Sequence, residues 1–177
     1  KTPIIYHDQV INQKRICDLT IGEIKQIEIG SVKNNLFPNQ INSKQQIPTL
    51  EEVFVLFQQS TNKTELNLEL KYESETTTLS EKDYWEELRK SIVKYQELIP
   101  KIMITSFSKK LLVERPDDNL FSGIHTGLLI EDSFDENESF HLKNKLNLTY
   151  ISLESSLFES VEQVKNLKKT GLQVYTW

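Results

Sequence analysis

The stretch ELNLELK, residues 65–71, alternates leucines with polar and charged residues. Successive side chains of a β-strand point to opposite faces, so residues two apart share a face. The stretch therefore predicts a short strand with one apolar face that enters a core. Its other face carries Glu69 and Lys71, two opposite charges that would lie side by side in space.

Five further stretches have the β-branched and aromatic residues that are typical of strands. They are PIIY (3–6), KIMITSF (101–107), GLLIE (127–131), LTYISLE (148–154) and LQVYTW (172–177). Together with residues 65–70 they make six predicted strands.

Helical patterns occupy most of the segments between these strands. They are LTIGEIKQIEIG (19–30), PTLEEVFVLFQQS (48–60), DYWEELRKSIVKYQELIP (83–100), SFSKKLLVERP (106–116) and SVEQVKNLKKTG (160–171). Thr20 with Glu23, and Thr49 with Glu52, have the spacing of capping boxes, which start helices. Gly30 and Gly171 are predicted to end the first and the last of these helices.

This alternation of strands and helices predicts an α/β fold of parallel strands joined by right-handed crossovers. A doubly wound sheet and a (β/α)8 TIM barrel both satisfy the pattern. A barrel typically takes about 250 residues, so six strands in 177 residues fit a barrel that lacks two units. We therefore expect residues 1–177 to form a single partial barrel domain with a polar surface excursion at about 31–47.

Composition excludes several classes of protein. The chain is 37% hydrophobic and 27% charged, which is typical of a soluble globular domain. No apolar run approaches the roughly 20 residues needed to span a membrane, and a net charge of −5 gives no reason to expect nucleic acid as a partner. Cys17 is the single cysteine, which fits a reducing compartment and favours a cytoplasmic location.

His7 and Asp8 close the first predicted strand. The carboxyl ends of parallel strands form the active face of α/β proteins, so His7 stands where a general acid or base is expected. The alternative is a structural histidine at a cap or in the core. Asp8 either orients His7 or caps the turn.

Glu69 and Lys71 close the second predicted strand at the same level. A glutamate is a suitable ligand for an oxygen-preferring divalent ion such as Mg²⁺ or Ca²⁺, and a lysine meets a phosphate as a point charge. A simple Glu–Lys ion pair at the barrel mouth accounts for the same spacing.

An ordered set of motifs resembles the glycerophosphodiester phosphodiesterase family, whose members are TIM barrels that hydrolyse glycerophosphodiesters to glycerol 3-phosphate and an alcohol. The motifs span nearly the whole chain, and their order is more specific than any one of them. They are PIIYHD (3–8), DLTIGEIKQIEIG (18–30), IPTLEEVFVLF (47–57), LNLELK (66–71), ITSF (104–107) and GLQVYTW (171–177).

The resemblance implies a role for each candidate residue. His7 matches the second of the family's two catalytic histidines. Glu69 matches a metal-binding glutamate, Lys71 the lysine that follows it, and Trp177 the aromatic residue that flanks the substrate. A divalent metal, Mg²⁺ or Ca²⁺, and a small-molecule phosphodiester substrate are therefore expected.

The sequence also departs from the family pattern. The family's first two strands carry a His-Arg pair and a Glu-x-Asp motif that are absent here, and the segment after Asp8 is shorter than usual. We therefore expect an internal piece of a longer protein that is inactive alone. Two alternatives stay open: a non-catalytic barrel that binds a phosphate-containing ligand, and a related phosphodiesterase of the phospholipase type.

Overall fold

The chain divides into two compact units, Lys1–Thr61 and Asn62–Trp177. The computed structural model describes residues 1–29, 45–60, 64–73, 77–158 and 160–177. Most of the excursion predicted at 31–47 lies outside these described residues, and the prediction of a single domain stays a prediction. No helix within the described ranges is long and apolar enough to cross a membrane.

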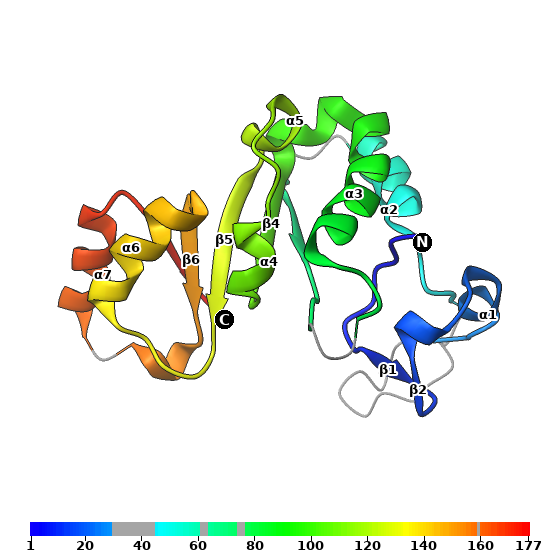
Figure 1. Ribbon diagram of the computed structural model, residues 1–177, viewed down its shortest axis with the longest axis horizontal. Coiled ribbons are helices and arrows are strands. Elements are labelled where there is room, and N and C mark those ends of the chain that lie inside the picture. The colour runs from blue at the N-terminus through cyan, green and yellow to red at the C-terminus, as the bar shows by residue number, and fades with distance from the viewer. Residues whose placement is uncertain (30–44, 61–63, 74–76, 159) are drawn as a thin grey trace. The chain divides into compact units, whose positions relative to one another are not determined.

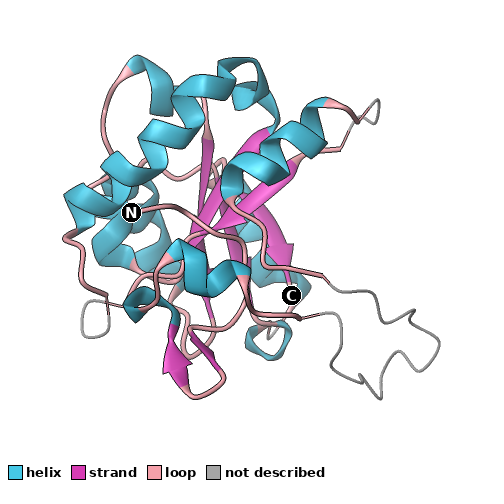
Figure 2. Ribbon diagram, turned by 90° about the vertical axis from the view of Figure 1, so that its right-hand side faces the viewer, coloured by secondary structure: helices cyan, strands magenta, loops and turns pink. Residues whose placement is uncertain are grey.

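In the first unit a short hairpin follows Asp8, in the segment that is shorter than the family pattern. Strand β1 (Val10–Ile11) pairs antiparallel with β2 (Lys14–Arg15) (Figure 2). The two turn residues, Asn12 and Gln13, have φ of 49° and 64°, the left-handed conformation that matches the twist of a tight hairpin. The 3₁₀ turn η1 (Ile16–Asp18) follows directly.

Both predicted capping boxes start helices in this unit. Thr20 caps α1 (Ile21–Lys25) with Glu23, and Thr49 caps α2 (Leu50–Gln58) with Glu52. Helix α1 ends earlier than predicted, because the chain turns extended and Glu28 forms an antiparallel bridge with Gln46. The core of the unit is a small apolar cluster around Ile11, Ile24 and Ile47.

The prediction that residues 3–6 form a parallel strand is wrong. Ile4 makes an isolated antiparallel bridge with Thr49, and the neighbouring backbone bonds run from Ile5 to Pro48 and from Leu50 to Pro3. The segment thus pairs with the entry to α2, which satisfies its backbone polar groups locally.

The second unit alternates strands and helices throughout (Figure 1). Its elements are β3 (Leu66–Glu69), α3 (Glu81–Ile92), η2 (Val93–Lys101), β4 (Ile102–Ser106), α4 (Lys109–Val113), α5 (Asn119–Ser122), β5 (His125–Ile130), α6 (Glu136–Leu146), β6 (Tyr150–Leu153), η3 (Ser155–Leu157), α7 (Val161–Lys169) and β7 (Gln173–Thr176). The helices α5 and α6 have no counterpart among the predicted patterns, and the helix predicted over 83–100 changes to 3₁₀ geometry after Ile92.

The described strands β3 to β7 form one parallel sheet in sequence order. A doubly wound sheet reverses its strand order, whereas this order does not reverse. Right-handed crossovers that always advance in one direction place their helices on one face of the sheet. The arrangement confirms the α/β class and is that of an incomplete (β/α)8 barrel.

The outward face of the sheet forms the main core with the helices. The fully buried side chains of this layer include Ile104, Leu128 and Ile151. Trp85 of α3 is also fully buried, and its indole N–H donates to the carbonyl of Leu111 at 2.8 Å.

The sheet curls strongly toward its inward face. The Tyr150 hydroxyl of β6 lies 3.2 Å from the carbonyl of Ile104 and 3.4 Å from Asn67 Oδ1 of β3. In a flat sheet β6 and β3 would be about 14 Å apart, three strand spacings. These contacts therefore require the curvature of a barrel wall.

Gly127 of β5 makes room for this contact. It faces Tyr150 in the β5–β6 register, and a Cβ at Gly127 would lie 2.2 Å from the Tyr150 ring. Because Gly127 has no side chain, the tyrosine ring extends across β5 and reaches β4 and β3.

We expect Gly127→Ala to lower the free energy of unfolding by about 1–3 kcal/mol, since the added methyl overpacks a buried ring. Urea denaturation followed by circular dichroism measures this change. Gly22→Ala is the matched control, because its added Cβ meets nothing closer than 4.0 Å. Replacing a glycine inside a helix by alanine stabilises the folded protein by about 0.5–1 kcal/mol. Equal stability of the two variants would contradict the assigned packing.

Candidate functional site

The carboxyl end of β3 carries an ion pair. Lys71 Nζ lies 2.5 Å from Glu69 Oε1, and the two side chains are 30% and 29% exposed. The Glu69 Oε1 atom itself is buried, so the lysine rather than solvent compensates its charge. The structure thus brings these two predicted site residues together on one face of the strand, and the ion pair considered from the sequence is present.

The backbone that presents this pair is fixed by neighbouring hydrogen bonds. The Leu70 amide donates to the Thr105 carbonyl at 2.7 Å, and the Ser106 hydroxyl donates to the Leu70 carbonyl at 2.8 Å. The Tyr84 hydroxyl donates to the Lys71 carbonyl at 3.3 Å, and burial raises the pKa of Tyr84 to about 12. Lys71 therefore stands on a well-anchored strand end.

Two aromatic side chains continue the site from other strands. Phe107 follows β4, and its ring centroid lies 5.7 Å from Lys71 Nζ. Trp177 follows β7, and its ring meets Phe107 edge-to-face at 5.6 Å. Trp177 was predicted as a site residue, whereas Phe107 was not. The signal that could have found Phe107 is its place at the carboxyl end of a predicted strand.

A polar layer lies below the site on the inward face of the sheet. The Thr105 hydroxyl donates to Asn67 Oδ1 at 3.0 Å, and Tyr150 approaches the same oxygen. Burial raises the pKa of Tyr150 well above its usual range, so this hydroxyl stays protonated and serves as a donor. The layer supports the floor of the site and contributes no charge.

His7 lies in the first unit and is well exposed, with 81% of its side chain accessible. Its Nδ1 lies 2.8 Å from Asp8 Oδ1, which agrees with the orienting role considered for Asp8. Glu69, Lys71 and Trp177 belong to the second unit. The convergence of His7 with these three residues stays a prediction.

Neither of the other two histidines follows the carboxyl end of a strand. His141 is an exposed residue within helix α6. His125 begins β5, so it lies at the amino end of the parallel sheet, whereas Glu69 and Lys71 lie at the carboxyl end.

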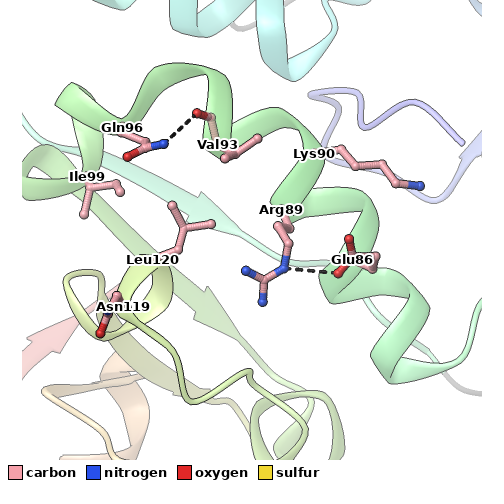
Figure 3. A pocket seen from close by; sticks show the side chains of 8 residues that line it. All are labelled: Glu86, Arg89, Lys90, Val93, Gln96, Ile99, Asn119 and Leu120. Atoms are coloured by element: carbon pink, nitrogen blue, oxygen red, sulfur yellow. Dashed lines mark hydrogen bonds and ion pairs between the residues drawn. The ribbon is translucent and has the colours of Figure 1, made fainter.

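A surface pocket of about 370 Å³ lies on the helical side of the second unit (Figure 3). It is lined by Glu86, Arg89, Lys90, Val93, Gln96, Ile99, Asn119 and Leu120. Its cations are already paired, because Arg89 binds Glu86 and Asp118, and Lys90 binds Glu87. Its walls immediately precede β4 and β5, which places it toward the amino ends of the strands and away from the ion pair.

The described residues do not form a complete metal site. No group of three or more His, Cys, Asp or Glu side chains gathers within the part of the chain that the structure describes. Mg²⁺ and Ca²⁺ take about six or more ligands, usually including more than one carboxylate. Glu69 fits as one such ligand, but a single carboxylate does not make a metal site.

Comparisons with known proteins agree with this fold. The sequence matches the Glycerophosphoryl diester phosphodiesterase family over residues 1–177, whereas a search of curated proteins found no match.

Among solved structures, a phosphodiesterase from Oleispira antarctica in complex with the product sn-glycerol-3-phosphate is 23% identical, with a TM-score of 0.79 over 99% of this chain and 67% of that one. A glycerophosphodiester phosphodiesterase from Parabacteroides distasonis is 20% identical, with a TM-score of 0.70 over 98% of this chain and 64% of that one. A protein from Galdieria sulphuraria is 22% identical, with a TM-score of 0.68 over 93% of this chain and 58% of that one. At these identities the structures support the fold, and this chain spans 58–67% of their lengths.

Proposed function

This chain belongs to the glycerophosphoryl diester phosphodiesterase family, and we propose that its protein hydrolyses glycerophosphodiesters to glycerol 3-phosphate and an alcohol. The observation that carries this proposal is the family match over all 177 residues. The position of the Glu69–Lys71 pair at the carboxyl end of a parallel strand supports it, since this is where barrel enzymes place their chemistry.

Lys71 is the proposed phosphate-binding residue. Its ammonium is a compact point charge with three donors, and Glu69 neutralises it in the present arrangement. An approaching phosphate oxygen competes with the Glu69 carboxylate for that ammonium. Trp177, which is 51% exposed, flanks the substrate from the end of β7.

His7 is the proposed proton carrier. The contact of its Nδ1 with Asp8 favours the tautomer with the proton on Nδ1, because a carboxylate accepts that hydrogen bond. Nε2 is then available for one of the two proton transfers, either from the attacking hydroxyl or to the leaving alkoxide. The other transfer falls to the second histidine that the family pattern implies.

Divalent-metal dependence, with Mg²⁺ or Ca²⁺, is part of the proposal. When bound, such an ion supplies positive charge that stabilises the negative charge on the phosphate oxygens. Glu69 would be one of its ligands. Because the described residues give no complete site, the 177-residue chain is expected to bind the ion weakly.

We expect Glu69→Gln in the intact protein that contains residues 1–177 to weaken Mg²⁺ or Ca²⁺ binding by at least about tenfold. Loss of a group that merely supports a metal ligand already costs about 10–100-fold, and this change removes the carboxylate itself. Isothermal titration with each ion measures the effect. Glu162→Gln, an exposed carboxylate on α7, is the control that should leave affinity unchanged, and equal affinity of both variants would remove Glu69 from the metal site.

The decisive test of the function is release of glycerol 3-phosphate from glycerophosphocholine by the intact protein, with and without a chelator. Release that the chelator abolishes is the expected result. Binding of glycerol 3-phosphate without turnover would favour the non-catalytic barrel. Cleavage of phosphatidylinositol or sphingomyelin instead of glycerophosphocholine would favour the phospholipase-type alternative.

A further inference from the structure

Phe107 lies in the short connection between strand β4 and helix α4. It follows Ser106, the last residue of β4, and precedes Ser108, which caps α4 by accepting from the Leu111 amide at 3.1 Å. The Ser108 amide in turn donates to the Ser106 hydroxyl at 3.1 Å. Two serines thus fix the backbone on both sides of a half-buried ring.

The ring lies next to the Lys71 ammonium. Their separation of 5.7 Å is within the range in which an aromatic face attracts a cation. Lysine has a flexible four-carbon stem, so its charged end needs contacts that keep it in place. Glu69 supplies one such contact and Phe107 supplies another.

The two contacts differ in a way that matters for binding an anion. Glu69 holds the ammonium with an opposite charge, which a phosphate must compete with. The Phe107 ring holds it through its quadrupole and has no net charge. The ring therefore keeps the Lys71 ammonium in place without neutralising its charge. The attraction between ring and ammonium persists when the Glu69 carboxylate binds another partner.

Trp177 supports the ring from the far edge of the sheet. Phe107 and Trp177 meet edge-to-face at 84°, although β4 and β7 are separated by β5 and β6. The curl of the sheet brings the two rings together. The Phe107 ring is thus in contact with Trp177 on one side and with Lys71 on the other.

We propose that Phe107 is a positioning residue that holds Lys71 for the phosphate group. The inference rests on the proposed function, because it assigns Phe107 to the same site. Phe107 acts through the lysine and carries no chemical step.

The test measures binding of sn-glycerol 3-phosphate to the intact protein by isothermal titration, which needs no turnover. Phe107→Leu removes the ring face and is expected to weaken binding by roughly 3- to 10-fold, the size of a partly exposed cation–π contact. Phe57→Leu, the same change at a half-buried position of α2, should leave affinity unchanged. Phe107→Tyr keeps the ring and should stay close to wild type.

A double-mutant cycle with Lys71→Met tests whether Phe107 affects binding through the Lys71 ammonium. If Phe107 acts through the ammonium, Phe107→Leu adds no further loss when Lys71 has no charge. An equal loss in both backgrounds, or wild-type affinity of Phe107→Leu, would overturn the proposal. Circular dichroism checks that each variant is folded, and Phe107→Met replaces Phe107→Leu in the cycle if the leucine variant is not.

The outcome for Phe107 is separable from the outcome for the proposed function. Turnover of glycerophosphocholine by a wild-type protein whose Phe107→Leu variant binds normally would refute the role of Phe107 alone. Phosphate binding that depends on Phe107, in a protein without turnover, would support the positioning role and refute the hydrolase.

Discussion

Trp85→Ala should lower the free energy of unfolding by about 3–5 kcal/mol, the usual cost of deleting a large buried aromatic side chain. Trp85 is fully buried and packs edge-to-face on Phe121 of α5 at 5.2 Å. Its removal also takes away the hydrogen-bond donor of the Leu111 carbonyl, which then stays buried without that partner. Urea denaturation of the 177-residue chain, followed by far-ultraviolet circular dichroism, measures the loss.

The second tryptophan provides a matched control. Trp177 is 51% exposed and has the Phe107 edge-to-face contact, so Trp177→Ala should cost no more than about 1.5 kcal/mol. The two variants remove the same atoms from one buried and one exposed position. Similar losses in both would show that α3, α4 and α5 do not pack around Trp85 as described.

The sequence predicted the strands of the second unit well, because each alternates or clusters residues that suit a buried strand. The stretch at 65–70 became β3, and its charged pair lies on one face as the period of two requires. The crossover rules then fixed the parallel order. The prediction succeeded where the signal was local and repeated.

The same local signal misled at residues 3–6. PIIY has strand composition, but composition does not say which segment a strand will pair with. Here the partner is the chain entering α2, at Thr49. Helix α6 (Glu136–Leu146) was missed for the opposite reason, since its sequence has few apolar residues and a weak helical period.

The site was partly visible in the sequence. Glu69 and Lys71 are two residues apart, so their contact follows from strand geometry. The contact between Phe107 and Trp177 joins residues 70 positions apart in the chain, and it depends on how far the sheet curls. Gly127 and Tyr150 are similar, because the need for a glycine at 127 appears only once the tyrosine ring lies across β5.

His7→Ala in the intact protein should cut turnover of glycerophosphocholine by roughly 10²–10⁴-fold, the contribution of a positioned general acid or base. The alanine removes the imidazole that carries one of the two proton transfers, from the nucleophile or to the leaving alkoxide. Binding of Mg²⁺ or Ca²⁺ should be unaffected, because His7 is not a proposed ligand. Release of glycerol 3-phosphate over time, and titration with the ion, measure the two quantities separately.

His125→Ala is the control for this change, because it removes another exposed imidazole, at the amino end of β5. Turnover should survive that substitution, since no reacting group is expected at the amino ends of barrel strands. A mutant that loses turnover and metal binding together would indicate that His7 holds the site together and does not move a proton. Equal rates for wild type and His7→Ala, insensitive to chelator, would end the assignment of both His7 and Glu69, because proton transfer and metal-assisted charge stabilisation would then have to come from other residues.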